Sequence, residues 1–305
     1  MLSAWISFAA SVSYGIPSVS LYLLTSYIIL KHRKTFNSSF FHLYIYDGFM
    51  NLFTYFTGFF SMRLSSITCR DCLFSPFYTN VGRFFSMKFV IAMGYHMAYV
   101  QYSITTLIAL NRLSVLLKFN VCEPLWKKYT WIAILLIYFL PFINTGLVFK
   151  YNAQVVYLDE YECYSIVSSQ LPVLELYSVL IPFMLITIII SVCSNITSVC
   201  IVRNVSTQKK NRADVNFLII MCITCTVQVV GTVISVSILH MGSSTLMLIL
   251  AMVLPYVSDG LSLVQPWLLV AFSHTLREKM RLMFGWKRRD NPAQNPMFVQ
   301  RSVTN

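Results

Sequence analysis

The sequence predicts an all-α membrane protein, a bundle of seven transmembrane helices with its N-terminus outside. Of its 305 residues, 57% are hydrophobic and only 11% are charged, whereas ordinary soluble domains carry about 25% charged residues. Seven apolar runs each approach the ~20 residues that cross a bilayer. Lys and Arg gather between alternate runs, which is typical of the cytoplasmic loops of membrane proteins.

The seven expected spans form one domain over residues 1–272. They cover residues 9–30, 40–60, 86–111, 130–149, 171–201, 215–239 and 245–272. Basic residues follow the first run and do not precede it, so we interpret it as an uncleaved span and not as a secretory signal. The inner segments hold 18 Lys and Arg residues and the outer segments hold 4. This ratio predicts that the N-terminus is outside and the C-terminus inside.

The third span is expected to lie at the centre of the bundle. Lys88 and Arg112 bracket it, and at helical rise they are about 36 Å apart. Between them the span carries many polar residues, which are too costly for a helix that faces lipid on most sides. These residues are His96, Tyr99, Gln101, Tyr102, Ser103, Thr105, Thr106 and Asn111.

Residues 273–289 are expected to form a short amphipathic helix on the inner membrane surface. Apolar residues recur there at helical spacing, and most basic residues lie away from that stripe, a pattern typical of helices that bind anionic lipids. Residues 290–305 are polar and are expected to be a flexible cytoplasmic tail. The net charge of +12 is explained by these membrane-flanking clusters, so no nucleic-acid partner is expected.

Four local stretches resemble the nematode serpentine chemoreceptors of the class gamma superfamily, in particular class V and class gamma. They are YGIPSVSLY at 14–22, FNSSFFHLY at 36–44 leading to Asp47, LNRLS at 110–114, and QPWLL at 265–269 followed by Ser273 and Arg277. The resemblance implies a G protein-coupled receptor in the plasma membrane, in the cilium of a sensory neuron. It implies as partners a small extracellular molecule, an odorant or a pheromone, and a heterotrimeric G protein, with no catalytic residue, metal or cofactor.

The same resemblance assigns roles in coupling and activation. Asn111 and Arg112 are similar to the motif at the inner end of the third helix of such receptors, where the arginine engages the G protein or latches a neighbouring helix. The family pattern has an acid where this chain has Asn111, so the resting state is not held by an ionic lock from that position. An arginine that only anchors the helix end at the headgroups is the alternative.

Acids in the second and seventh spans and a proline in the seventh are further candidates for a role in coupling and activation. Asp47 resembles the midmembrane acid of such receptors, and Asp259 precedes Gln265 and Pro266, which are similar to the hinge of the seventh helix. Acids are expensive in lipid and are expected to face the bundle interior, and Pro266 permits a kink. A static polar network that only fixes packing is the alternative interpretation.

The candidate ligand zone lies in the outer half of the third and fifth spans. Steps of three and four residues place most of its members on one helical face. A cation and aromatic rings at that depth suit a carboxylate or a polar ring, but for Lys88 and Glu175 an internal ion pair without a ligand role is the favoured interpretation. The zone comprises Lys88, Tyr95, His96, Tyr99, Tyr102 and Glu175.

Three cysteines are expected to face the oxidising exterior. Cys163, in the second outer loop, is expected to form a disulfide with Cys72, or alternatively with Cys69. The receptor bridge of related families starts from the top of the third helix, where this chain has Met87. The bridge is therefore expected to be shifted.

Other classes of membrane protein have sequence features that differ from those of a receptor. A transporter is expected to have paired halves with interrupted helices, and the sequence contains no such repeat. An intramembrane enzyme needs converging His, Asp or Glu clusters, and the five histidines fall in different segments without motif spacing. A polytopic transporter or a ligand-gated channel remains the alternative to the receptor.

Overall fold

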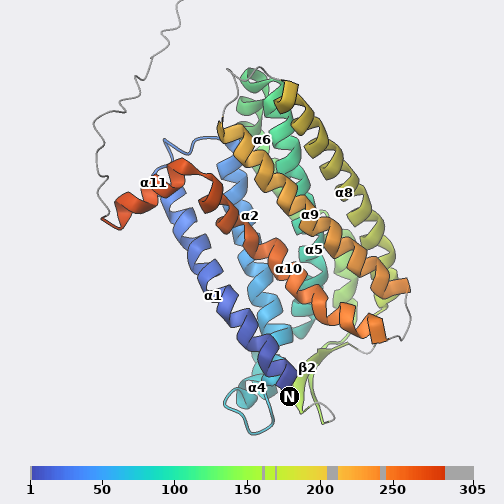
Figure 1. Cartoon of the computed structure of the whole chain (residues 1–305). Coiled ribbons are helices and arrows are strands. Elements are labelled where there is room, and N and C mark those ends of the chain that lie inside the picture. Colours follow the sequence, from blue (N-terminus) through green and yellow to red (C-terminus); the bar gives the residue numbers. More distant parts are fainter. Residues whose placement is uncertain (1, 160–161, 169, 205–211, 241–244, 286–305) are drawn as a thin grey trace, which may run out of the picture.

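The computed structural model describes residues 2–159, 162–168, 170–204, 212–240 and 245–285. Within these residues a long helix lies in all or part of each expected span, and the helices form one bundle (Figure 1). The N-terminus, α4 and β2 lie at one end, which we call the outer end, and α11 lies at the opposite, inner end. The long helices are α1 (Leu2–Lys31), α2 (Ser39–Gly58), α5 (Met87–Leu117), α6 (Phe119–Phe139), α8 (Val173–Asn204), α9 (Arg212–His240) and α10 (Thr245–Phe272).

The helix α5 is the central one, as the sequence predicts. It contacts α2, α6, α8 and α9, and half of its most apolar stretch is buried, compared with 17% for the segment Phe119–Lys150. In the part of the chain that the structure describes, five helices are long and apolar enough to cross a membrane: Trp5–Lys31, Met87–Leu117, Phe119–Lys150, Val173–Asn204 and Val215–Ile238. The other two expected spans, in α2 and α10, carry the buried acids Asp47 and Asp259.

The second helix continues past its expected end at residue 60. A π-helical turn, η1 (Phe59–Leu64), follows α2 directly and passes into the short helix α3 (Ser65–Ile67). A π-helical turn holds more residues than an α-helical turn, so the side chains that follow it point in other directions than they would in a continuous α-helix. Such turns are frequent at functional sites. Here the turn brings Arg63 into the bundle, where its side chain is buried.

The connection between the third and fourth spans is shorter than expected. The helix α5 ends at Leu117 and α6 begins at Phe119, so only Lys118 separates them, although residues 112–129 were expected to be an inner loop. At the other end of this span Pro141 ends the regular helix, because a proline removes a backbone hydrogen bond. The short elements α7 (Phe142–Thr145) and η2 (Gly146–Lys150) follow.

The outer end carries structure that the all-α prediction did not include. The helix α4 (Ser75–Phe84) lies in the first outer loop, and β1 (Gln154–Leu158) and β2 (Cys163–Val167) form an antiparallel hairpin in the second. Val155 pairs with Ile166, and Tyr157 pairs with Tyr164. The hairpin and α4 pack on the outer ends of α2 and α5 through a small apolar cluster around Val81, Met87 and Val90.

The amphipathic helix after the seventh span is α11 (His274–Met283). Ser273 caps it by accepting a hydrogen bond from the backbone N–H of Leu276 at 3.3 Å, and the Leu276 side chain is fully buried. Arg277 donates to the carbonyl oxygens of Val270 and Ala271 at the end of α10, where a cation is favourable. The expected continuation of this helix, residues 286–289, and the expected tail, residues 290–305, lie outside the described residues.

Candidate functional site

Arg112 lies at the inner end of α5 against two phenyl rings. Its guanidinium carbon is 4.2 Å from the ring centre of Phe40 on α2 and 4.1 Å from that of Phe217 on α9. The two rings also contact each other, with centres 4.5 Å apart. A guanidinium over an aromatic face is stabilised by about 2 kcal/mol when it is shielded from water. We call Arg112, Phe40 and Phe217 the aromatic clamp, and it connects three helices.

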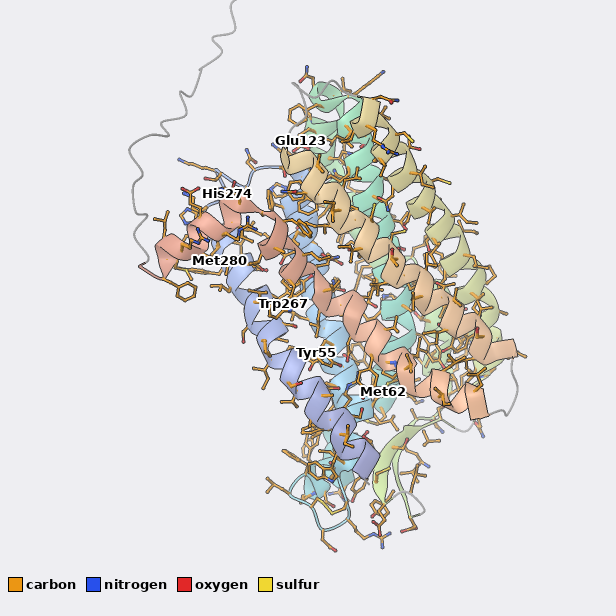
Figure 2. The ribbon with its side chains drawn as sticks, in the orientation of Figure 1. Tyr55, Met62, Glu123, Trp267, His274 and Met280 are labelled. Carbon is orange, nitrogen blue, oxygen red and sulfur yellow. A yellow bond between two sulfur atoms is a disulfide. The ribbon has the colours of Figure 1, made fainter. Side chains whose placement is uncertain are left out.

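The neighbouring Asn111 belongs to a buried polar chain. Its Nδ2 donates to Ser39 Oγ at 2.8 Å, and Ser39 Oγ donates to Glu123 Oε2 on α6 at 2.7 Å. The backbone N–H of Ser39, at the start of α2, donates to Glu123 Oε1 at 2.8 Å. A carboxylate is favourable at a helix N-terminus. This chain connects the inner ends of α2, α5 and α6 around a buried acid, Glu123, at the inner end of the bundle (Figure 2).

Sequence reasoning missed Glu123, Ser39 and the two phenylalanines of the clamp. The signal for Glu123 was present, because it is the only acid in the basic segment 112–129 and it forms a second contact with Lys127 Nζ at 3.6 Å. Phe217 gave no comparable signal, since nothing in its spacing links α9 to residue 112.

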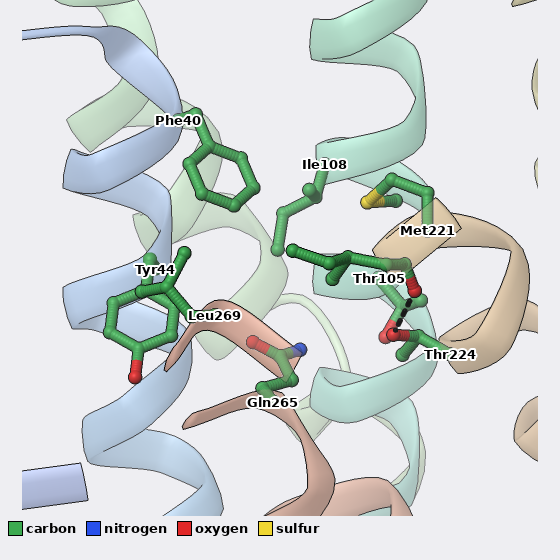
Figure 3. A pocket seen from close by; sticks show the side chains of 9 residues that line it. Phe40, Tyr44, Thr105, Ile108, Met221, Thr224, Gln265 and Leu269 are labelled. Atoms are coloured by element: carbon green, nitrogen blue, oxygen red, sulfur yellow. Dashed lines mark hydrogen bonds between the residues drawn. The ribbon is translucent and has the colours of Figure 1, made fainter. Parts of the chain in front are cut away.

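Two small cavities lie beside this inner cluster. One, of about 20 Å³, is bounded by Arg112 and by residues of α5, α8 and α9: Val115, Leu116, Asn195, Ser198, Leu218 and Met221. The other, of about 10 Å³, lies between α2, α5, α9 and α10 (Figure 3). Its lining is mostly apolar, with Thr105, Thr224 and Gln265 as polar members. Both cavities are at the size of a single water molecule.

Asp47 lies at mid-height in a polar network that connects four helices. Its carboxylate is buried beside Asn51 and Gln265. Asn51 Nδ2 donates to the hydroxyl of Tyr22 at 3.2 Å, and Gln101 Nε2 on α5 donates to Asn51 Oδ1 at 3.1 Å. Gln265 precedes Pro266, so the hinge-like segment of α10 and the acid of α2 are adjacent.

Asp259 lies closer to the outer end and forms an ion pair that was not expected. Arg63 of η1 donates to its Oδ2, and the hydroxyl of Tyr14 on α1 donates to the same oxygen. The Arg63 guanidinium also lies over the ring of Tyr256, 4.9 Å from its centre. Because it follows the expected end of the second span, Arg63 was expected in the first outer loop; this expectation is wrong, since the π-helical turn directs Arg63 inward.

The expected ligand residues on α5 face three different neighbours. Tyr95 contacts the ring of Tyr177 on α8, with ring centres 5.8 Å apart. Tyr99 contacts Phe183 on α8 at 4.9 Å, and its hydroxyl accepts a hydrogen bond from Asn144 Nδ2 at 2.7 Å. The face toward α8 therefore presents two tyrosines.

His96 and Tyr102 point elsewhere. His96 is fully buried against α7, with Nδ1 at 3.0 Å from Thr145 Oγ1 and its ring centre at 4.1 Å from that of Phe142. The Tyr102 hydroxyl donates to the carbonyl oxygen of Gln228 on α9 at 3.1 Å. Each of these side chains therefore joins α5 to one other helix.

Lys88 and Glu175 do not form the ion pair that was the favoured interpretation of these two residues, and that expectation is wrong. Lys88 Nζ donates to the carbonyl oxygen of Phe149 at 3.4 Å, and Glu175 is exposed in the first turn of α8. The ion pairs found within the described residues join other side chains.

The expected disulfide is wrong. Cys69 bonds Cys72, three residues away in one turn, where the Cys72 N–H also donates to the Cys69 carbonyl at 3.2 Å. Cys163 is a free thiol, and burial raises its pKa. The local pairing is available because both cysteines lie in the same turn, whereas Cys163 starts strand β2.

Aromatic and polar contacts, and not a disulfide, join the hairpin to the first outer loop. The Tyr164 ring stacks on that of Tyr78 in α4 with centres 5.6 Å apart, and its hydroxyl lies 2.8 Å from Ser75 Oγ. Arg70 pairs with Asp159 at 3.0 Å and lies over the ring of Tyr157. The outer end is therefore covered by a layer in which both loops take part.

Comparison with known proteins agrees with this architecture. The model of the Srg family, described as "Srg family chemoreceptor", matches residues 8–280 of the chain. The chain is also 27% identical over 283 residues to serpentine receptor class gamma-31 of Caenorhabditis elegans, which covers 89% of this chain and 90% of that relative. Of the two sister classes considered, the match is thus to class gamma. The chain belongs to the Srg family of chemoreceptors, a family of multi-pass membrane receptors and not of enzymes.

Proposed function

We propose that this chemoreceptor binds a small extracellular molecule, an odorant or a pheromone, and activates a heterotrimeric G protein. The observation that carries the proposal is the aromatic clamp, in which Arg112 of α5 contacts α2 and α9 at the inner end. Because it connects three helices through one side chain, the clamp acts as a two-state element. It is closed when both phenyl rings contact Arg112, and it is open when α9 moves away.

The ligand is received in the outer half of the bundle, between α5 and α8. Tyr95 and Tyr99 face α8 there, and Lys88 and the exposed Glu175 lie at the outer ends of these helices. Aromatic faces with one cation and one acid suit a small molecule with a polar ring or a carboxylate. His96 and Tyr102 act as positioning residues, because their contacts with Thr145 and Gln228 fix α5 against its neighbours.

The signal passes down α5 and α10 to the clamp. Asp47 and Gln265 lie side by side at mid-height, so a shift of α10 at Pro266 changes the surroundings of the acid. Asp259 connects the outer part of α10 to α1 and η1. At the inner end Asn111 holds α2 and α6 through Ser39 and Glu123. Opening of the clamp then exposes Arg112 to the G protein.

Ligand-dependent nucleotide exchange on a co-expressed G protein tests this function. Odorant and pheromone panels are applied to cells that express the chain, and ion current is recorded in the same cells. We expect exchange without current, whereas current without exchange contradicts the receptor and favours the channel. A fluorescent tag in sensory neurons tests the expected placement in the plasma membrane of the cilium.

Arg112→Ala is expected to abolish exchange and to leave the amount of receptor at the cell surface unchanged. The matched control is Arg33→Ala, because Arg33 is also a basic residue near the inner end but is exposed. The control is expected to keep full exchange. If Arg112→Ala keeps exchange at the level of Arg33→Ala, the coupling role of Arg112 is wrong.

A further inference from the structure

The helix α4 has a buried apolar face and, next to it, exposed apolar side chains. Tyr78 and Val81 are buried against the bundle. Beside this buried face Phe77 is 47% exposed and Phe84 is 86% exposed, and Leu73, in the turn just before α4, is 87% exposed. A spacing of seven residues places Phe77 and Phe84 on one side of α4. We call Leu73, Phe77 and Phe84 the outer stripe.

The depth of the outer stripe follows from its contact with α2. The ring centre of Phe77 is 5.3 Å from that of Phe60. Phe60 follows Phe40, the clamp residue at the inner end, by twenty positions, which corresponds to about 30 Å of helix. This distance equals the thickness of the hydrocarbon core of a bilayer, roughly 30 Å. Phe77 therefore lies where the outer hydrocarbon edge meets the headgroups.

Neighbouring aromatic residues mark the same level. Phe59, next to Phe60, contacts Phe8 of α1 with ring centres 5.5 Å apart, and Phe8 contacts Trp5 at 6.1 Å. Trp5 is 49% exposed near the outer end of α1. Half-exposed Trp and Tyr residues at helix ends form the aromatic belts of membrane proteins. The outer stripe of α4 continues this belt around the bundle.

We propose that α4 is an interfacial anchor that lies in the outer leaflet, with phospholipid as its partner. The outer stripe enters the boundary between acyl chains and headgroups, and Arg83, exposed in the last turn of α4, faces the phosphates. Helices with one apolar side and a cationic edge bind membranes in this way. The anchor fixes the position of the first outer loop, and with it the hairpin that Tyr78 and Ser75 contact.

Photocrosslinking of the full chain in lipid nanodiscs tests the anchor. The photoreactive residue p-benzoylphenylalanine replaces Phe77 or Phe84, and, as a control, Asp159, whose side chain is 82% exposed on the hairpin. We expect phospholipid adducts by mass spectrometry at positions 77 and 84 and none at 159. Adducts with a second copy or with another protein, or no adducts at 77 and 84, overturn the proposal.

A second measurement does not depend on the crosslinker. Phe84→Trp adds one tryptophan to the outer stripe, and Asp159→Trp adds one to the hairpin. With phospholipids brominated near the headgroup, we expect loss of most of the emission that Phe84→Trp adds over the parent chain, and no loss for Asp159→Trp. Equal emission of Phe84→Trp in brominated and ordinary lipid overturns the anchor. Neither measurement involves a ligand or a G protein, so both are independent of the proposed function.

Discussion

Replacement of Phe217 by leucine removes one aromatic face from Arg112 and leaves an apolar side chain of similar size in the half-buried position. The guanidinium carbon lies 4.1 Å from the centre of this ring, so the variant loses a contact of about 1–2 kcal/mol. The lost contact destabilises only the closed state of the clamp, because Phe217 contacts Arg112 only when α9 lies against α5. Such a loss changes the ratio of open to closed receptor roughly 5- to 30-fold.

Basal nucleotide exchange without ligand, measured with purified receptor and G protein in nanodiscs, reports this ratio. We expect Phe217→Leu to raise it by about 5-fold or more, and Phe217→Tyr to leave it near the parent level, since tyrosine keeps the ring. Thermal unfolding of both variants controls for a general loss of stability. Basal exchange of Phe217→Leu equal to that of Phe217→Tyr would refute the clamp as the element that holds the resting state.

Two further variants and one labelling experiment test other contacts of the structure. Asp259→Asn leaves Arg63 buried without its counter-charge and is expected to destabilise the receptor by about 3–5 kcal/mol, read as a lower midpoint of thermal unfolding in nanodiscs; an unchanged midpoint contradicts the buried pair. Glu123→Ala removes the acceptor of both Ser39 hydrogen bonds and is expected to cost about 1 kcal/mol, which chemical denaturation measures. The thiol of Cys163 is expected to be alkylated while the other two outer cysteines remain bonded, in peptide mass spectra. Because burial raises its pKa and the thiolate is the reactive form, its alkylation rate is expected to rise with pH above the range of an ordinary cysteine.

The sequence predicted the features that depend on composition along the chain. Apolar length and basic clusters predicted the bundle, and the polar residues between Lys88 and Arg112 predicted that the third span is central, which the burial of α5 confirms. The amphipathic helix after the seventh span was also predicted, because Leu276 and Met280 recur at helical spacing. These features are local, so a single sequence contains them.

Contacts between distant segments were not predicted. Arg112 contacts Phe217, more than a hundred positions away, and no spacing rule connects them. The expected bridge from Cys163 was wrong because a neighbouring pair in one turn was available. The hairpin was missed although Gln154–Leu158 and Cys163–Val167 contain the β-branched and aromatic residues that favour strands.

The π-helical turn at Phe59–Leu64 has a consequence for comparing this chain with its relatives. A turn of this kind accommodates one more residue than an α-helical turn, and one residue corresponds to about 100° of rotation. A relative that lacks the additional residue would direct the side chain at position 63 toward lipid and lose its partner on α10. Sequence alignments of the family should therefore permit a single gap within 59–64, and a gap there should coincide with a neutral residue in place of Asp259.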